Sequence, residues 1–231
     1  MVYGILLAAG SGSRFGQKKQ YLELAGVPVW RRALDTLWEA GVDGVWLVVP
    51  ADDLPGFQER VIWDGKLRVV AGGPSRSESV QKGLRAIVDS IPSLLNRDSI
   101  LIHDAARPFV HPSDVRRVID EAAQVGGAIL AGPCTDTVKQ VSDTQAILRT
   151  IPRADLTLAQ TPQVFWWEWV QAHYLQATAD ELNRATDDAS IMEQSGRPVK
   201  AVIGVHPNMK VTTQRDWEYA EWLANRRWGS K

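Results

Sequence analysis

"LLAAGSGSRFGQKKQYLELAG", residues 6–26, contains an apolar run that ends in two alanines and a loop with three glycines and several cations. In an open α/β sheet, ligands bind beyond the carboxyl ends of the strands. Glycines let backbone N–H groups approach phosphate oxygens, and lysine and arginine supply positive charge. The stretch therefore predicts a buried first strand followed by an anion-binding loop at residues 10–19.

Two familiar phosphate-binding patterns do not fit this loop. A dinucleotide fingerprint would need glycine at position 15, where Phe15 stands. A P-loop would need glycine five residues after Gly10 or Gly12, where Phe15 and Gln17 stand. The spacing is instead G-x-G-x-R-x-G-x-x-K, which excludes a dinucleotide-binding oxidoreductase.

Size and composition indicate one globular domain over residues 1–231, with 45% hydrophobic and 23% charged residues. The formal net charge of −1 gives no global field that would favour nucleic acid or an anionic membrane. The only cysteine is Cys134, so no internal disulfide can form and we expect a cytoplasmic protein. The apolar start is too short to span a bilayer, and no basic region precedes it, which favours a buried strand over a signal peptide.

Short apolar runs alternate with longer amphipathic stretches along the chain. The predicted strands are residues 3–9, 44–49, 67–71, 99–104, 127–132 and 199–203. The predicted helices are residues 28–41, 77–91, 113–126, 166–178, 187–195 and 214–227. This alternation predicts an α/β fold with a doubly wound, mostly parallel, Rossmann-like sheet.

Two of the predicted helices carry clear packing signals. Ser75 and Glu78 have capping-box spacing, and the helix after them has one apolar face. That face comprises Val80, Leu84, Ile87, Val88 and Ile91. The last helix has an apolar stripe of Trp217, Ala220, Leu223 and Ala224, with Trp222 alongside.

The alternation lapses at residues 132–155. Residues 137–141 and 147–151 favour β-structure and flank a turn-like "SDTQ". This predicts an inserted hairpin, and a lone hairpin is rarely stable in water. We therefore expect it to act as an arm that packs on a second subunit.

The chain contains ten tryptophans, three of them in "FWWEWVQAHYL" (165–175). Aromatic side chains can stack on single-stranded nucleic acid, but here no basic stripe accompanies them. Burial on helix faces or at a subunit interface is favoured, because indoles carry a large apolar area with one donor.

The glycine-rich stretch, with its tail "KQYL", resembles the signature of nucleotidyltransferases that make activated sugars and polyols. Within that group it is similar to the cytidylyltransferase family that acts on 2-C-methyl-D-erythritol 4-phosphate. Further motifs match this family in order over essentially the whole chain, although the family usually has proline where Lys18 stands. These motifs are "GGPSRSESV" (72–80), "HDAARPF" (103–109), "DTVK" (136–139), "TPQ" (161–163), "ATDDAS" (185–190) and "NMKVT" (208–212).

The resemblance implies attack by a phosphate monoester on the α-phosphorus of CTP, with pyrophosphate leaving. The monoester is already mostly a dianion at pH 7, so no general base is required. Catalysis would rest on positioning and on preorganised cations. By resemblance, Arg14 and Lys19 stabilise the transition state, whereas Lys18 is expected to be a solvated neighbour.

The resemblance also implies Mg²⁺ on the triphosphate, held by Asp104 at the end of a predicted strand. Arg107 then orders Asp104, meets the substrate or forms a structural salt bridge. Asn208 is a candidate second oxygen ligand. Side chains alternate along a strand, so His103 points away from Asp104 and is expected to be a packed core histidine.

The nucleotide contacts implied by the resemblance come from the two glycine-containing loops. They are Ala8, Ala9, Gly10, Gly12, Gly73 and Ser79. A bland alternative for the second loop is a turn followed by a capped helix, and both can hold together because a helix start offers free N–H groups.

The family pattern assigns the second substrate to Arg153 and Lys210, with Arg107 and Thr137 beside them. Thr186 and Asp187 resemble contacts to the polyol hydroxyls, with an N-cap pair as the alternative. The arm implies a homodimer, with Arg153 and Thr137 acting across the interface.

Two rival functions are left open by the sequence. The same fold can act on ribitol 5-phosphate or another polyol phosphate, because the two enzymes share the CTP half of the site. A catalytically silent nucleotide-binding scaffold is the rival from another class. The presence of Arg14, Lys19 and Asp104 favours an enzyme over that scaffold.

Overall fold

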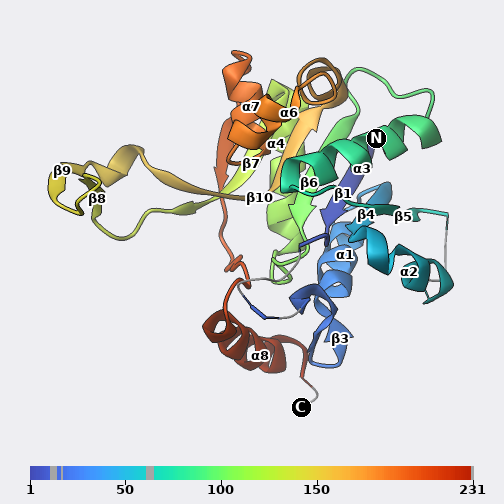
Figure 1. The fold of residues 1–231 in the computed structure, drawn as a ribbon, viewed down its shortest axis with the longest axis horizontal. Helices are drawn as coiled ribbons and strands as arrows, with labels where there is room; N and C mark the ends of the chain where they lie inside the picture. Colours follow the sequence, from blue (N-terminus) through green and yellow to red (C-terminus); the bar gives the residue numbers. More distant parts are fainter. Residues whose placement is uncertain (11–14, 17, 61–64, 230–231) are drawn as a thin grey trace.

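The computed structural model describes residues 1–10, 15–16, 18–60 and 65–229. Within these ranges a seven-stranded sheet has the order β11-β7-β10-β6-β1-β4-β5 and runs through the body of the molecule (Figure 1). Its strands are β1 (Val2–Leu7), β4 (Gly44–Val49), β5 (Leu67–Ala71), β6 (Ser99–Asp104), β7 (Gly127–Pro133), β10 (Thr157–Trp166) and β11 (Lys200–Ile203).

The register of the sheet brings the ends of its central strands together. β1 lies between β4 and β6 and is parallel to both, so Leu7 is opposite Val48 on one side and Asp104 on the other. β10 is antiparallel to β6 and β7. The predicted mostly parallel, doubly wound α/β class is confirmed.

Helices cover both faces of the sheet (Figure 1). α1, α2 and α4 pack on one face, and α3, α6 and α7 pack on the other together with α5 and the π-helix η4. The helices are α1 (Val29–Glu39), α2 (Leu54–Arg60), α3 (Arg76–Ser90), α4 (Pro112–Val125), α5 (Trp167–Trp169), η4 (Val170–Tyr174), α6 (Ala179–Arg184), α7 (Asp188–Gln194) and α8 (Gln214–Trp228). The remaining short elements are η1 (Lys19–Tyr21), β2 (Glu23–Leu24), β3 (Val27–Pro28), η2 (Ala51–Asp53) and η3 (Arg153–Asp155).

Adjacent residues of β1 enter opposite halves of the core, as expected for a strand covered on both faces. Leu6 packs with Leu34 and Leu37 of α1, whereas Ile5 packs with Leu84 of α3. The apolar face predicted for α3 is confirmed except at its end, where Val88 is 37% exposed.

The capping box predicted at the start of α3 is also confirmed. The Ser75 hydroxyl accepts a hydrogen bond from the Glu78 N–H at 3.2 Å, and the Ser75 N–H donates to the Glu78 carboxylate at 3.0 Å. Reciprocal capping satisfies two N–H groups that the first helical turn leaves without partners. It fixes the start of α3 beside the glycine pair that precedes it.

α8 packs below the sheet, against a separate cluster that includes Phe15, Leu24 and Phe109. Trp217 and the two alanines of its predicted stripe are buried. The expectation that Trp222 packs in the core is wrong, because its side chain is half exposed and stacks on Tyr219.

The region around residues 157–184 departs most from the sequence-based prediction. β10 was not predicted, because Pro162 and two glutamines interrupt its apolar pattern and its register shifts between Ala159 and Gln163. The single helix predicted at 166–178 is instead the short α5 followed by η4, and α6 was not predicted. The tryptophans of this region are confirmed as packing residues, since Trp167 and Trp169 are buried.

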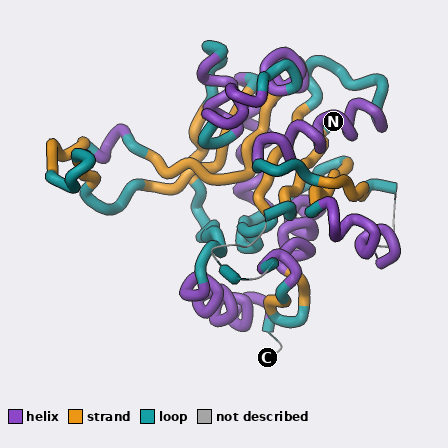
Figure 2. Tube along the Cα trace, in the orientation of Figure 1, coloured by secondary structure: helices purple, strands orange, loops and turns teal. Residues whose placement is uncertain are grey.

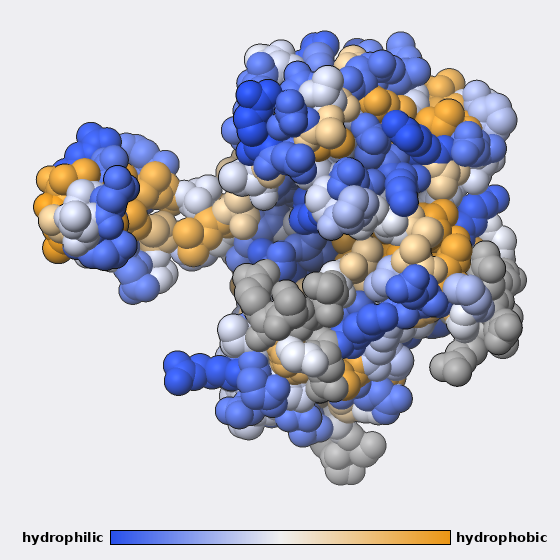
Figure 3. All heavy atoms as spheres, in the orientation of Figure 1, coloured by the Kyte–Doolittle hydropathy of each residue, from blue (hydrophilic) through white to orange (hydrophobic). Residues whose placement is uncertain are grey.

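The predicted hairpin is present as an arm (residues 134–156) between β7 and β10. Its strands are β8 (Val138–Val141) and β9 (Ile147–Ile151), paired antiparallel. The arm extends far from the body (Figures 1 and 2), and hydrophobic surface is visible on it (Figure 3). Val141, Ile147 and Leu148 on the arm, and Leu158 at its base, are all exposed large hydrophobic residues.

Among the described residues, no helix combines the length and the apolar character needed to cross a membrane.

Candidate active site

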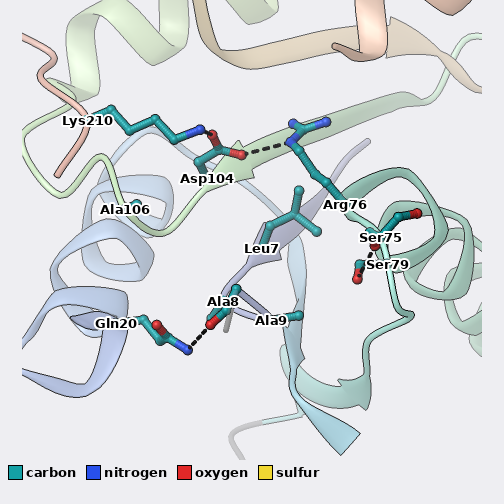
Figure 4. A pocket seen from close by; sticks show the side chains of 11 residues that line it. Leu7, Ala8, Ala9, Gln20, Ser75, Arg76, Ser79, Asp104, Ala106 and Lys210 are labelled. Carbon is teal, nitrogen blue, oxygen red and sulfur yellow. Dashed lines mark hydrogen bonds and ion pairs between the residues drawn. The ribbon is translucent and has the colours of Figure 1, made fainter. Parts of the chain in front are cut away.

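A pocket lies where β1 and β6 end and α3 begins (Figure 4). Ala8, Ala9 and Gly10 line it after β1, and Asp104 and Ala106 line it after β6. Parallel strands place their carboxyl ends at one edge of the sheet, so two loops that are about a hundred residues apart share this edge. Ser75, Arg76, Ser79, Gln20 and Lys210 complete the lining with Leu7.

Asp104 is a buried carboxylate held between two cations. The Lys210 ammonium contacts its Oδ2 at 2.6 Å, and the Arg76 Nε contacts its Oδ1 at 3.2 Å (Figure 4). Burial alone would raise the pKa of Asp104, but the charges of Arg76 and Lys210 outweigh it and hold that pKa well below its usual range. The pocket therefore contains an ionised carboxylate at neutral pH.

Arg76 also forms a second, stronger ion pair, on the side away from Asp104. Its two terminal nitrogens donate to the Asp188 carboxylate at 2.9 and 2.8 Å. Asp188 is fully buried at the start of α7 and also accepts a hydrogen bond from the Tyr174 hydroxyl at 3.1 Å. Burial would lower the pKa of the guanidinium, but the two carboxylates raise it.

The two loops of the pocket approach each other closely. The Gln20 amide donates to the Gly10 carbonyl at 3.0 Å and so ties the glycine-rich loop to η1 (Figure 4). A Cβ on Gly72 would lie 2.6 Å from the Ala9 Cβ, which only glycine avoids. The Gly73 N–H donates to the Ser79 hydroxyl at 3.0 Å, so the turn and the capped helix expected there are both present.

Part of the predicted anion loop cannot be placed. Gly12 and Arg14 lie outside the described residues, and so does the side chain of Lys19, although its backbone begins η1. Lys18, expected to be a solvated neighbour of the loop, is exposed. It forms an ion pair with Asp53 at 2.6 Å, because η2 brings this carboxylate beside it.

Three predicted residues cluster beside Asp104 without lining the pocket. His103 is fully buried and exchanges a hydrogen bond with the Thr161 hydroxyl at 2.9 Å, which confirms it as a core histidine. The Arg107 guanidinium donates to the Asn208 carbonyl at 2.9 Å, and no ion pair of Arg107 is seen among the described residues. The Asn208 side-chain NH₂ donates to Gln160 and to the Thr161 carbonyl, while its buried Oδ1 has no hydrogen-bond partner among the described residues.

Of the described residues expected at the second substrate, Lys210 is the one that lines the pocket. Asp187 is the N-cap of α7, accepting from the Ser190 N–H at 3.0 Å, so the capping alternative is confirmed for this residue. Thr186 is exposed just before it. Thr137 and Arg153 are exposed on the arm, where Arg153 donates to the Thr135 carbonyl.

Three residues of this region were not predicted from the sequence: Arg76, Asp188 and Gln20. A signal for Asp188 existed, because helical spacing puts it on the apolar face of α7 with Ile191 and Met192, and a buried acid requires a partner. Nothing local in the sequence names Arg76 as that partner, since 112 residues separate them.

The described residues hold no group of three or more His, Cys, Asp or Glu side chains that could bind a metal by themselves. Among the described residues that line the pocket, Asp104 is the one that carries a carboxylate. Such a site suits a cation that arrives with a phosphate ligand, because Mg²⁺ commonly uses one or two carboxylates together with substrate phosphates.

A doubly wound sheet with a cation-lined pocket at its carboxyl edge fits a nucleotidyltransferase, the class of the solved structures that share this fold. Two solved structures share this fold over nearly their whole length. The 4-diphosphocytidyl-2C-methyl-D-erythritol synthase of Anaerococcus prevotii has a TM-score of 0.79 at 30% identity, covering 98% of this chain and 96% of that one. The 2-C-methyl-D-erythritol 4-phosphate cytidylyltransferase of Thermus thermophilus has a TM-score of 0.76 at 29% identity, covering 97% and 100%.

Residues 2–226 match the family described as 2-C-methyl-D-erythritol 4-phosphate cytidylyltransferase, and the chain belongs to that family. The protein of that name from Geobacter metallireducens is 40% identical, with 95% of this chain and 96% of the relative covered. The one from Pelotomaculum thermopropionicum is 38% identical, with 99% and 96% covered. These matches support 2-C-methyl-D-erythritol 4-phosphate as the substrate and give no support to ribitol 5-phosphate.

Proposed function

We propose that this chain transfers the cytidylyl group of CTP to 2-C-methyl-D-erythritol 4-phosphate. A phosphate oxygen of the substrate forms a bond to the α-phosphorus of CTP, and the bond from that phosphorus to the β-phosphate bridging oxygen breaks. The products are 4-diphosphocytidyl-2-C-methyl-D-erythritol and pyrophosphate. The observation that carries this proposal is the family match over residues 2–226.

CTP binds, in this proposal, between the two glycine-containing loops. Ala8, Ala9 and Gly10 line the pocket on one side and Ser79 lines it on the other. Gly12 and Gly73 belong to the same loops. Glycine at position 72 lets these two loops lie in direct contact, because a side chain there would clash with Ala9. Cytosine offers an amino donor that backbone carbonyls of these loops can accept.

The chemistry requires two anions to meet, so the cations of the site carry the catalysis. Arg14 and Lys19 stabilise the charge that concentrates around phosphorus and on the leaving oxygen. Losing one such contact typically costs roughly 3–4 kcal/mol in the barrier. Lys210 lies at the pocket beside Asp104, where it can hold the attacking phosphate in line.

The remaining contacts to the polyol phosphate come from four regions of the chain. In this proposal Arg107 and Lys210 contact the substrate phosphate in the chain that holds the CTP, and Thr186 and Asp187, just before α7, contact the polyol hydroxyls. Thr137 and Arg153 lie on the arm, so their contribution requires a partner subunit.

Mg²⁺ is the cofactor that this site suits, with Asp104 as its protein ligand. Asp104 is ionised and faces the pocket, and the two cations beside it fix its orientation. When bound, Mg²⁺ would neutralise charge on the triphosphate and help pyrophosphate to leave. Asn208, whose buried Oδ1 has no hydrogen-bond partner in the described part of the chain, is the candidate second oxygen.

A homodimer in the cytoplasm completes the proposal. Exposed apolar residues on a projecting hairpin support an arm that is buried against a second copy, because large apolar surfaces on isolated proteins are uncommon. The single cysteine supports a reducing compartment.

The first experiment is pyrophosphate release with CTP and Mg²⁺, with 2-C-methyl-D-erythritol 4-phosphate and D-ribitol 5-phosphate offered in parallel. Release with the first substrate alone is expected. Release with the second alone would move the protein to another polyol phosphate. No release with either substrate, while CTP still binds, would contradict an enzymatic function.

A further inference from the structure

Asp188 is a fully buried carboxylate that the proposed reaction does not use. It does not line the pocket, yet its only cation in the described structure, Arg76, does line it. The guanidinium therefore connects a buried acid at the start of α7 with Asp104 at the end of β6.

The geometry divides the donors of Arg76 between the two carboxylates. Both terminal nitrogens bind Asp188, at 2.9 and 2.8 Å, which is the two-pronged arrangement that a planar guanidinium favours. The contact with Asp104 is made by Nε, at the longer distance of 3.2 Å. Asp188 thus fixes the plane and position of the guanidinium, and the Nε contact then sets the orientation of Asp104.

Stability alone gives a weak reason for such an arrangement. A buried ion pair often contributes no more to folding than well-packed apolar residues of the same volume, because both charges must be desolvated. In contrast, the groups that orient a metal ligand have large effects, and their loss commonly lowers metal affinity or activity by about 10- to 100-fold.

We propose that Asp188 is a positioning residue for the metal-binding carboxylate Asp104 and acts through Arg76. This inference rests on the proposed function of Asp104 as the ligand of Mg²⁺. Without Asp188, the guanidinium would have Asp104 as its only remaining anionic partner. It would then turn toward Asp104 and compete with Mg²⁺ for the same oxygens.

The test uses Asp188→Asn and Arg76→Lys in the full chain. The first removes the charge that anchors the guanidinium. The second keeps the positive charge but cannot bridge two carboxylates with a fixed fork. Arg85→Lys is the matched control, because Arg85 is an exposed arginine on the same helix that lies outside the pocket lining and donates to Gln81 of α3.

Two quantities are measured for each variant: the Mg²⁺ concentration that gives half-maximal CTP binding by calorimetry, and the Mg²⁺ concentration that gives half-maximal turnover. Both are expected to rise about 10- to 100-fold in Asp188→Asn and in Arg76→Lys, and to stay unchanged in Arg85→Lys. CTP binding without metal should be nearly the same in all of them. Circular dichroism establishes that each variant is folded, and the two variants make the test independent of either one alone.

Asp104→Asn is measured in the same way to separate this inference from the proposed function. If its Mg²⁺ requirement rises while Asp188→Asn and Arg76→Lys match the wild type, the positioning role is overturned and the metal role of Asp104 stands. If the Mg²⁺ requirement of Asp104→Asn is also unchanged, both fail. A lower melting temperature with an unchanged Mg²⁺ requirement would give Asp188 a structural role only.

Discussion

His103 and Asp104 are neighbours on β6 whose protonation is set by opposite surroundings. Asp104 faces two cations, which keep it ionised. His103 points to the other face and is fully buried, and burial lowers its pKa to about 4. Two adjacent residues on one strand therefore differ in charge: Asp104 is ionised in the pocket, and His103 is neutral in the core.

This contrast predicts how the free energy of unfolding depends on pH. The unfolded chain protonates His103 near pH 6.5, whereas the folded chain resists protonation until about pH 4. The free energy of unfolding should therefore decrease by about 3 kcal/mol as the pH falls from 6.5 to about 4. Urea denaturation of the wild type and of His103→Asn between pH 7 and pH 4 measures it.

The free energy of unfolding of His103→Asn should decrease less steeply over the same pH range, because the variant lacks the imidazole that takes up a proton on unfolding. His111 and His173, whose pKa values burial also lowers, contribute equally to both proteins. Equal slopes in the two proteins would show that His103 is not the group that titrates. Asp104 affects the free energy of unfolding at lower pH than His103 does. Its pKa is lowered in the folded state, so its ionised form stabilises the fold above pH 3.8, the ordinary pKa of Asp, and this contribution is lost as the pH falls below 3.8.

At the scale of elements, the strands with continuous apolar runs were predictable and β10 was not. β4, β5 and β6 coincide with their predicted ranges, because strands covered on both faces are apolar throughout. β10 has polar residues and a register shift in its middle, so its hydrophobic pattern matches neither a continuous apolar strand nor an amphipathic helix.

The site was predictable where one sequence motif supplies both partners. The capping box of Ser75 and Glu78 at the start of α3 is an example. The position of Asp104 at the end of β6 was also predictable, because the apolar run before it marks the strand. The contacts of Arg76 with Asp188 and of Lys210 with Asp104 join residues more than one hundred positions apart, and only the packing of α7 and of the segment before α8 brings them together.

The junction between α4 and β7 gives a prediction at this scale. Gly126 ends α4 with φ +96°, and a Cβ there would overlap the ring of Trp169. Gly126→Ala combines left-handed backbone strain with overpacking and should lower the free energy of unfolding by roughly 2–4 kcal/mol. Urea denaturation checks this.

Gly196→Ala is the control for Gly126→Ala. Gly196 also has a positive φ, +72°, but an added Cβ would meet nothing within 4 Å. The free energy of unfolding of Gly196→Ala should be lower by only about 1 kcal/mol, because only the strain of the left-handed backbone is added. Equal losses in the two variants would remove the Trp169 contact from the explanation.

At the scale of the whole molecule, the proposed site divides between a body and an arm. Lys210 and Asp104 lie at the pocket in the body, whereas Arg153 and Thr137 are exposed on the arm that projects from it (Figure 1). A homodimer in which each arm reaches its partner would give every site residues from two chains. Symmetric dimers make such an exchange reciprocal.

Mixing inactive subunits tests this division. Arg153→Ala and Lys210→Ala should each be nearly inactive alone. If Arg153 serves the partner's pocket and Lys210 its own, a mixed dimer has one doubly altered site and one intact site. Random mixing should then restore roughly a quarter of wild-type pyrophosphate release.

Lys210→Ala mixed with Asp104→Asn is the matched control, because both residues lie at the same pocket. Every site of that mixed dimer carries one change, so no activity should return. Recovery in the first mixture and none in the second would place Arg153 in the partner's site. Equally low activity in both mixtures would contradict the shared site and confine Arg153 to its own chain.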